Sequence, residues 1–84
     1  MKSKEVVVHW REGLHLRPAA RLGLAAKRFH STIHLRCNGQ VADLRNILSI
    51  VMLCAAMGTT LVLEVSGDDE QEATQAIEQV FLSR

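Results

Sequence analysis

The feature that most constrains the fold is a central stretch with the pattern of a tight β-hairpin. From Thr32 to Cys37, polar and apolar residues alternate, which is the period of a strand with one face on a core. Asn38-Gly39 follows directly, and this dipeptide favours the two-residue turn that joins antiparallel strands. We therefore expect the segment from Gln40 to Leu44 to pair antiparallel with the strand before it.

Two other segments have the character of strands. Three consecutive valines lie between Glu5 and His9, and β-branched residues of this kind favour extended backbone. From Thr60 to Val65, a buried-type apolar residue recurs at every second position. Together with the hairpin, these segments predict four strands. Strands with this alternation are typical of an antiparallel sheet that has one covered face.

Helices are expected in the segments between these strands. The first runs from Leu16 to Phe29, where apolar residues recur at helical spacing and form one stripe. Pro18 suits its first turn, because an amide at that place has no partner within the helix. The second helix begins after Asn46, a residue type that caps helices, and is expected to run to about Met57.

A third helix should close the chain. Asp69, with Glu72 three positions later, resembles a capping box, and an apolar stripe runs from Ala73 to Phe81. The order of elements is therefore βαββαβα. The chain has 84 residues, of which 48% are hydrophobic, so we expect a single domain over residues 1–84. The economical architecture is an open-faced two-layer α+β sandwich, a four-stranded antiparallel sheet with three helices on one face.

The charge balance excludes some classes of partner. The formal net charge is +1, so nothing global indicates a nucleic acid or a membrane surface as partner. Residues 46–63 carry no formal charge, which comes close to the ~20 apolar residues that a membrane span requires. Gly58, Thr59 and Thr60 interrupt this run, so two short elements are the better interpretation and we expect no membrane insertion.

The cysteines and the extra histidines do not predict a metal centre. Cys37 and Cys54 lack the spacing of a zinc or redox pair, and a secretory apolar segment is missing, so a cytoplasmic location is expected. His9, His30 and His34 could be combined with Cys37 into a metal site. No recognised ligand spacing links them, and we expect no metal.

The stretch from Gly13 to Ala19 carries the residues with the clearest chemistry. It places His15 at the N-cap position of the first expected helix and Arg17 two residues later. Free amides and the positive end of the helix dipole attract phosphate there and oppose a positive charge on the imidazole. A neutral imidazole is a nucleophile, and a guanidinium binds phosphoryl oxygens. The alternative is that His15 is only a polar cap and Arg17 a solvated charge.

This stretch, Gly-Leu-His-Leu-Arg-Pro-Ala, closely resembles the active-site signature of the HPr family, the histidine-containing phosphocarriers of the bacterial sugar phosphotransferase system. The resemblance spans the chain and includes Asn38-Gly39, the apolar segment after Asn46 and the stretch 66–70 before the last helix. It implies an open-faced βαββαβα sandwich that is phosphorylated on a ring nitrogen of His15.

The resemblance also implies how the phosphoryl group is handled. Leu16, Arg17 and Pro18 would bind it, Enzyme I charged by phosphoenolpyruvate would donate it, and IIA-type proteins would accept it. Because each transfer is completed by the partner's active site, the chain would be a carrier and not a self-sufficient enzyme. A monomer without a cofactor is expected.

The segment from Ile47 to Met57 is apolar on nearly every side. A helix in one layer cannot bury every face, so Leu48, Val51 and Met52 should mark a partner site; the alternative is that they pack under the neighbouring helix. The resemblance implies that this helix and the active-site turn form one docking surface with a basic rim. We expect the surface to comprise Leu16, Ala20, Arg21, Lys27, Ile47, Leu48, Val51 and Met52.

Two positions depart from the family pattern. Leu16 stands where the family usually has alanine, which enlarges the apolar surface beside His15. Asn46 stands where many Gram-positive relatives have a serine that a dedicated kinase phosphorylates. Asparagine keeps the capping role but has no hydroxyl, so we expect this regulatory switch to be absent. Ser49, one turn on, is interpreted as an ordinary helix serine.

Other functions compete with that of a sugar-system phosphocarrier. A regulatory binding module could use the same surface without passing phosphate, although the intact stretch around His15 argues against it. A small phosphate-cleaving enzyme of ferredoxin-like topology is disfavoured by the strand order. The nitrogen-related branch of the phosphotransferase system uses the same chemistry and stays open. Trp10 could pack under the active-site loop or contact a partner.

Overall fold

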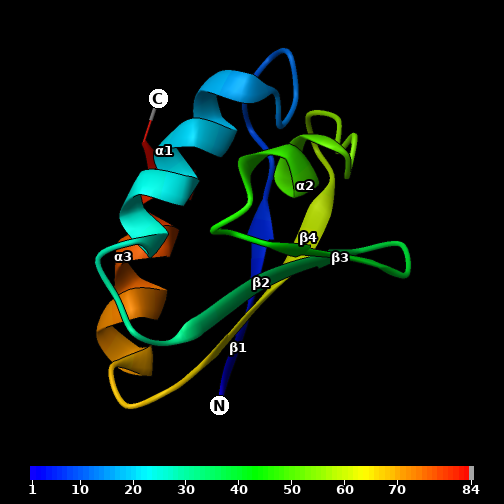
Figure 1. Cartoon of the computed structure of the whole chain (residues 1–84). Helices are drawn as coiled ribbons and strands as arrows, with labels where there is room; N and C mark the ends of the chain where they lie inside the picture. Colours follow the sequence, from blue (N-terminus) through cyan, green and yellow to red (C-terminus); the bar gives the residue numbers. More distant parts are fainter. Residues whose placement is uncertain (84) are drawn as a thin grey trace.

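The computed structural model describes residues 1–83 and has the element order βαββαβα that the sequence predicts. The elements are β1 (Lys2–Val7), α1 (Leu16–Ala26), β2 (Thr32–Cys37), β3 (Gln40–Asp43), α2 (Ile47–Val51), β4 (Thr60–Ser66) and α3 (Glu70–Leu82). The strands form one sheet, and the helices lie over one of its faces (Figure 1). The predicted open-faced α+β sandwich is confirmed.

All neighbouring strands in the sheet are antiparallel, in the order β1-β4-β2-β3. The register places Leu63 of β4 opposite Leu35 of β2, and Leu61 opposite Val6 of β1. Side chains alternate across a strand, so these residues share the face that the helices cover. The apolar residues of the alternating sequence pattern are therefore the ones that form the core.

The predicted hairpin is present with the expected turn. Asn38 and Gly39 both have positive φ angles, of 50° and 82°, as the two central residues of a type I′ turn require. β3 ends at Asp43, one residue earlier than expected, but the Leu44 amide still donates to the Ile33 carbonyl at 3.0 Å. The chain therefore leaves the sheet directly into the turn before α2.

One core joins the covered face of the sheet to the inner sides of the helices. Fully buried side chains come from both layers: Leu22, Ile33, Leu35, Leu61, Leu63, Val65 and Ile77. Each such leucine or isoleucine contributes about 1.5–3 kcal/mol relative to an exposed one. Within the helical layer, α1 contacts both α2 and α3. The helix that follows His15 is thus supported on both flanks.

The second helix is much shorter than expected, since it ends at Val51 and not near Met57. After it, Cys54 adopts a left-handed conformation with a φ of 52°, which breaks the helical path. The carbonyl of Ala55 accepts a hydrogen bond from the Leu14 amide at 2.8 Å, and the Gly58 amide donates to the Val8 carbonyl at 2.7 Å. The backbone after α2 therefore binds the loop between β1 and α1.

The uncharged run 46–63 is accordingly divided into α2, this loop and the start of β4. Within the described part of the chain, no helix combines the length and the apolar character that a bilayer crossing needs.

Two other boundaries differ from expectation. β1 covers Lys2–Val7 and not Glu5–His9, because β4 offers pairing partners as far as the residue opposite Lys2. α1 ends at Ala26 and not at Phe29, and its last residues tighten into a turn in which the Phe29 amide donates to the Ala26 carbonyl. Both differences are set by tertiary pairing and by turn geometry, and neither changes the fold.

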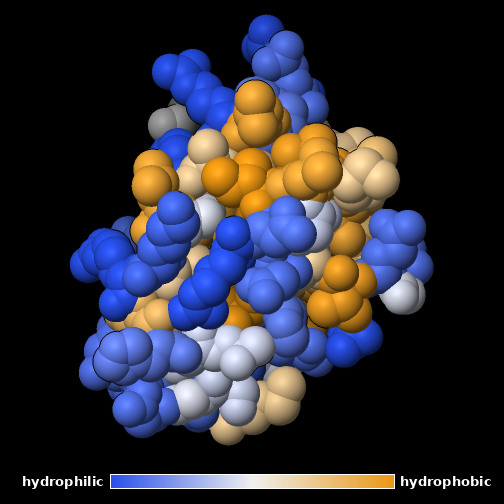
Figure 2. All heavy atoms as spheres, in the orientation of Figure 1, coloured by the Kyte–Doolittle hydropathy of each residue, from blue (hydrophilic) through white to orange (hydrophobic). Residues whose placement is uncertain are grey.

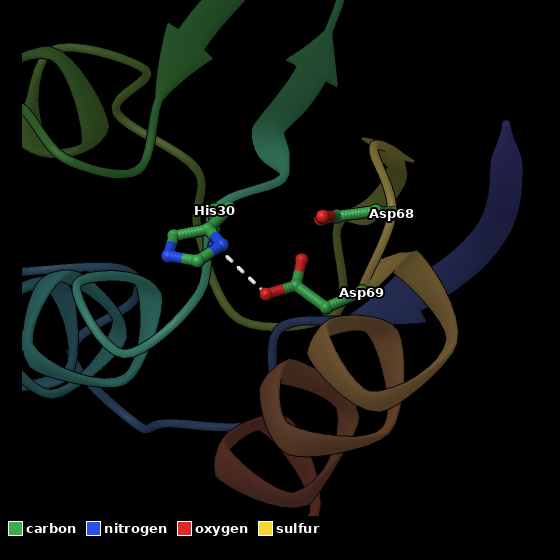
Figure 3. Close-up of side chains that lie close together, drawn as sticks. All are labelled: His30, Asp68 and Asp69. Carbon is green, nitrogen blue, oxygen red and sulfur yellow. Dashed lines mark hydrogen bonds between the residues drawn. The ribbon is translucent and has the colours of Figure 1, made fainter.

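Asp69 occupies the N-cap position of α3, but its carboxylate does not cap that helix, so the expected capping box with Glu72 is wrong. Oδ1 accepts hydrogen bonds from the amide and the hydroxyl of Ser31, and Oδ2 accepts one from the His30 amide at 2.8 Å (Figure 3). The Ser31 hydroxyl, followed by the His30 amide, lowers the pKa of Asp69 below its usual value. This carboxylate joins the loop before β2 to the start of α3.

Candidate functional site

His15 is the N-cap residue of α1, and its side chain is not used to cap the helix. Its backbone is extended, with φ of −88° and ψ of −169°, and its carbonyl accepts the first helical hydrogen bond, from Ala19 at 3.1 Å. The imidazole is 38% exposed. The ring is therefore free to react, while the first amides of α1 remain available to an anion.

The loop before His15 is held tightly from below. Gly13 has a φ of 79°, and a Cβ at this position would lie 2.6 Å from the Ala55 carbonyl oxygen, so no larger residue fits. The amide of Gly13 donates to the Trp10 carbonyl at 2.8 Å, and the side chain of Leu14 is buried in the core. These contacts fix where α1 begins, and with it the position of His15.

A cleft opens beside the imidazole. It is lined by Trp10, Arg11, Glu12, His15, Arg17, Pro18 and Arg21. The lining contains three guanidinium groups and one carboxylate. Its net charge is therefore positive and favours an anion even when the imidazole is neutral. The structure brings the predicted pair His15 and Arg17 into one site and adds residues from the loop after β1.

Within residues 1–83, the charged partner of His15 is Glu12, whose Oε1 lies 3.8 Å from Nε2 of the ring. This contact is an ion pair only when the imidazole is protonated. Glu12 and Arg11 were not predicted; they lie one and two residues before Gly13, and both line the cleft beside His15.

Trp10 is both packed and part of the cleft. Its ring centroid lies 5.4 Å from that of Phe81 and 4.7 Å from that of His9. Its indole Nε1 is buried and finds no hydrogen-bond acceptor in residues 1–83. Trp10 therefore packs against Phe81, while its position in the cleft lining leaves contact with a partner open.

The two other predicted basic residues of α1 lie in different settings. Arg21 lines the cleft and donates a hydrogen bond to the hydroxyl of Ser83, so its guanidinium is tied to the end of α3. Lys27 is exposed at the C-cap of α1. Only Arg21 therefore adjoins the histidine.

The predicted docking residues separate into an exposed and a half-buried set. Leu16, Leu48 and Met52 are 66%, 68% and 66% exposed. Figure 2 shows apolar side chains gathered over α2 and the adjoining part of α1. Ala20, Ile47 and Val51 are half-buried, the last two against the core. Two further exposed apolar side chains, Leu24 of α1 and Met57 of the loop after α2, were not among the predicted docking residues.

Comparison with known proteins assigns the chain to a family. The sequence matches the family described as the PTS HPr component phosphorylation site over residues 2–83. The chain belongs to the HPr family. The resemblance inferred from the stretch around His15 is confirmed. The matched family and the relatives named phosphocarrier protein HPr identify a phosphocarrier of the phosphotransferase system, which agrees with an arginine-lined cleft beside a histidine.

Individual HPr-family relatives match over most of their length. The phosphocarrier protein HPr of Cupriavidus necator is 34% identical over 84 residues, all of this chain and 94% of that protein. The HPr-like protein Crh of Halalkalibacterium halodurans is 36% identical over 77 residues, 92% of each chain. The crystal structure of HPr from Thermoanaerobacter tengcongensis superposes with a TM-score of 0.93 at 31% identity, covering 99% of this chain and 93% of that one.

In this HPr-family chain Asn46 caps α2, as the sequence predicts. Its side-chain oxygen accepts a hydrogen bond from the Ser49 amide at 3.2 Å. The Ser49 hydroxyl donates to the carbonyls of Asp43 and Asn46, at 3.0 and 2.7 Å. Ser49 is thus a structural part of the first turn of α2, which agrees with its interpretation as an ordinary helix serine.

The three extra histidines do not converge. The ring of His9 lies tilted against that of Trp10, His34 lies within β2, and His30 lies in the turn before β2. His30 does approach Asp68 and Asp69, with possible ligand atoms of the three side chains within 4.8 Å of one another (Figure 3). The oxygens of Asp69 already accept three hydrogen bonds from residues 30 and 31. The absence of a metal therefore stays a prediction.

Proposed function

We propose that this HPr-family protein carries a phosphoryl group on His15, accepts it from Enzyme I and passes it to IIA-type proteins. The observation that carries the proposal is the imidazole at the start of α1, which is not engaged in capping and opens into an arginine-lined cleft. A polar cap alone would turn its side chain to the helix amides, and His15 does not.

The chemistry requires a nucleophile, charge neutralisation and little else. A neutral ring nitrogen of His15 attacks phosphorus, a nitrogen–phosphorus bond forms, and the bond to the donor breaks; transfer to the acceptor reverses these roles. Protein catalysis of phosphoryl transfer is mainly positioning and electrostatic stabilisation. The amides of Leu16 and Arg17 and the Arg17 guanidinium supply the stabilisation. Pro18 has no amide hydrogen and serves by fixing the first turn.

The docking surface explains how a small carrier meets several partners. Leu16, Leu48 and Met52 present apolar area beside His15, and Ala20, Ile47 and Val51 support it from below. Burial of this area on docking places the histidine against the partner's reacting group and excludes water. Arg21 and Lys27 form the basic rim that favours an acidic partner surface.

We further propose that the chain acts as a monomeric single domain in the cytoplasm and needs no cofactor. Dimers are described for two relatives, HPr of Thermoanaerobacter tengcongensis and Crh of Bacillus subtilis, so the oligomeric state should be measured. The branch of the system, for sugar or for nitrogen, is decided by which Enzyme I and which IIA-type proteins exchange phosphate with the chain.

The decisive experiment is incubation of the protein with phosphoenolpyruvate and Enzyme I, followed by detection of phosphohistidine. We expect an acid-labile phosphoryl group on the wild type and none on His15→Ala. His30→Ala is the matched control, since His30 is exposed and lies in the turn before β2, outside the cleft. Labelling that persists in His15→Ala, or its absence from the wild type, would overturn the proposal. Partner binding without any labelling would instead favour a regulatory binding module.

A further inference from the structure

Arg11 and Arg17 reach the cleft of His15 from different parts of the chain. Arg17 belongs to the first turn of α1, whereas Arg11 lies in the turn that follows β1. Both line the same cleft as the imidazole. A phosphoryl group has several oxygens, so two guanidinium groups from separate segments can bind it together.

Neither arginine is engaged elsewhere in the described residues. No carboxylate of residues 1–83 lies within ion-pair distance of Arg11 or Arg17, and their side chains make no hydrogen bond there. Arg21, the third arginine of the cleft, donates to the Ser83 hydroxyl. Two guanidinium groups thus remain with their full donor capacity beside His15.

The charge of the phosphorylated site explains why Arg17 alone would not neutralise it. A phosphoryl group carries close to two negative charges at neutral pH, by analogy with other phosphorylated side chains. The carboxylate of Glu12, which lies 3.8 Å from the His15 ring, adds another on the same side of the molecule. Arg17 and Arg21 supply two positive charges against these. Arg11 adds a third and brings the phosphorylated state near charge balance.

We propose that Arg11 is a second phosphoryl-binding residue that acts with Arg17 and offsets Glu12. This inference rests on the proposed function of His15 and specifies how the charged state is held. Arg11 contacts the phosphoryl oxygens directly and adds to the affinity of the cleft for phosphate, which distinguishes it from a residue that only attracts a partner.

The first test measures inorganic phosphate binding to the unphosphorylated protein. Trp10 is the one tryptophan in the chain and lines the cleft, so its fluorescence and the ring signals of His15 report occupancy. We expect Arg11→Ala to weaken phosphate binding about three- to tenfold, as loss of a charge-assisted hydrogen bond at an accessible site does. Arg11→Lys should retain part of the affinity. Arg28→Ala is the control, because Arg28 is exposed and lies after the end of α1.

The second test measures the equilibrium of phosphoryl exchange between Enzyme I and the protein. Arg11→Ala should shift it toward phosphorylated Enzyme I by a similar factor, and Arg28→Ala should leave it unchanged. Phosphate affinity and exchange equilibrium equal to wild type in Arg11→Ala would overturn the proposal. So would a variant that changes only the salt-dependent KM for Enzyme I, since that result identifies a docking residue. If the wild type accepts no phosphoryl group, the proposed function fails, and phosphate binding alone still decides the role of Arg11.

Discussion

The carboxylate of Glu12 lies beside the His15 ring, and its effect on phosphate binding can be tested. Glu12 lies 3.8 Å from Nε2 and repels an incoming phosphate. Glu12→Gln should therefore strengthen binding of inorganic phosphate, by about two- to threefold, as expected for an exposed charge at this distance. Titration followed by Trp10 fluorescence measures the change. Glu72→Gln, an exposed glutamate of the first turn of α3, is the control and should bind as the wild type does.

A second residue-scale prediction concerns backbone strain beside the docking surface. Cys54 is exposed and adopts a φ of 52°, a region in which a side chain costs about 1–2 kcal/mol. Cys54→Gly relieves this cost but loosens the unfolded chain, so the net gain in unfolding free energy should be about 1 kcal/mol. Urea denaturation tests it. Ala56→Gly, at an exposed site without positive φ, should lower stability, and a Cys54→Gly protein no more stable than wild type contradicts the account.

At the scale of elements, the start of α2 depends on one side chain. Asn46 accepts from the Ser49 amide, so Asn46→Ala should lower the unfolding free energy by about 1 kcal/mol. Asn46→Asp keeps an acceptor at the same place and should retain nearly full stability. Denaturant unfolding of the two variants separates loss of the cap from loss of the amide itself. Equal destabilisation by both substitutions would show that capping is not the role of Asn46.

The junction between the turn before β2 and the start of α3 depends on Asp69. Its pKa is lowered in the folded protein by hydrogen bonds from Ser31 and His30, so this carboxylate stabilises the fold above the ordinary aspartate pKa of about 4. The stabilisation is lost as the pH falls through the lower, folded-state pKa. Asp69→Asn should lower the urea midpoint at pH 7, and the difference from wild type should shrink in strong acid. Asp68→Asn, at the exposed neighbour, should match the wild type at both pH values.

These elements also show where sequence reasoning succeeds and where it stops. The hairpin and the buried alternation of β4 follow from local rules, because turn type and side-chain period are properties of neighbouring residues. The length of α2 does not, since the apolar residues after Val51 form a loop that is held by long-range hydrogen bonds, from Leu14 to Ala55 and from Gly58 to Val8. The role of Asp69 was missed for the same reason. Its partners lie 38 and 39 residues away in sequence.

At the scale of the whole molecule, the candidate site likewise contains residues that local sequence predicts and residues that only the tertiary structure brings in. His15 and Arg17 are separated by one residue within a recognisable stretch, so their proximity is local. Glu12 and Arg11 join them only because Gly13 turns the chain over the segment 55–56. The set of charged residues in this cleft therefore depends on how the sheet, the loop after α2 and α1 pack together, and it cannot be predicted from local sequence.

The exposed apolar side chains of α1 and α2 form one surface only when the two helices are packed together. The role of this surface in docking can be tested at Leu48. Leu48 is 68% exposed, so Leu48→Asp should leave stability nearly unchanged. It should raise the KM for phosphorylation by Enzyme I about tenfold, the cost of losing one buried leucine at the interface. Val41→Asp is the matched control, since Val41 is 46% exposed but lies in β3, outside the docking surface and the cleft. A KM that rises equally in both variants would show general repulsion by added negative charge, and an unchanged KM in Leu48→Asp would place the docking surface elsewhere.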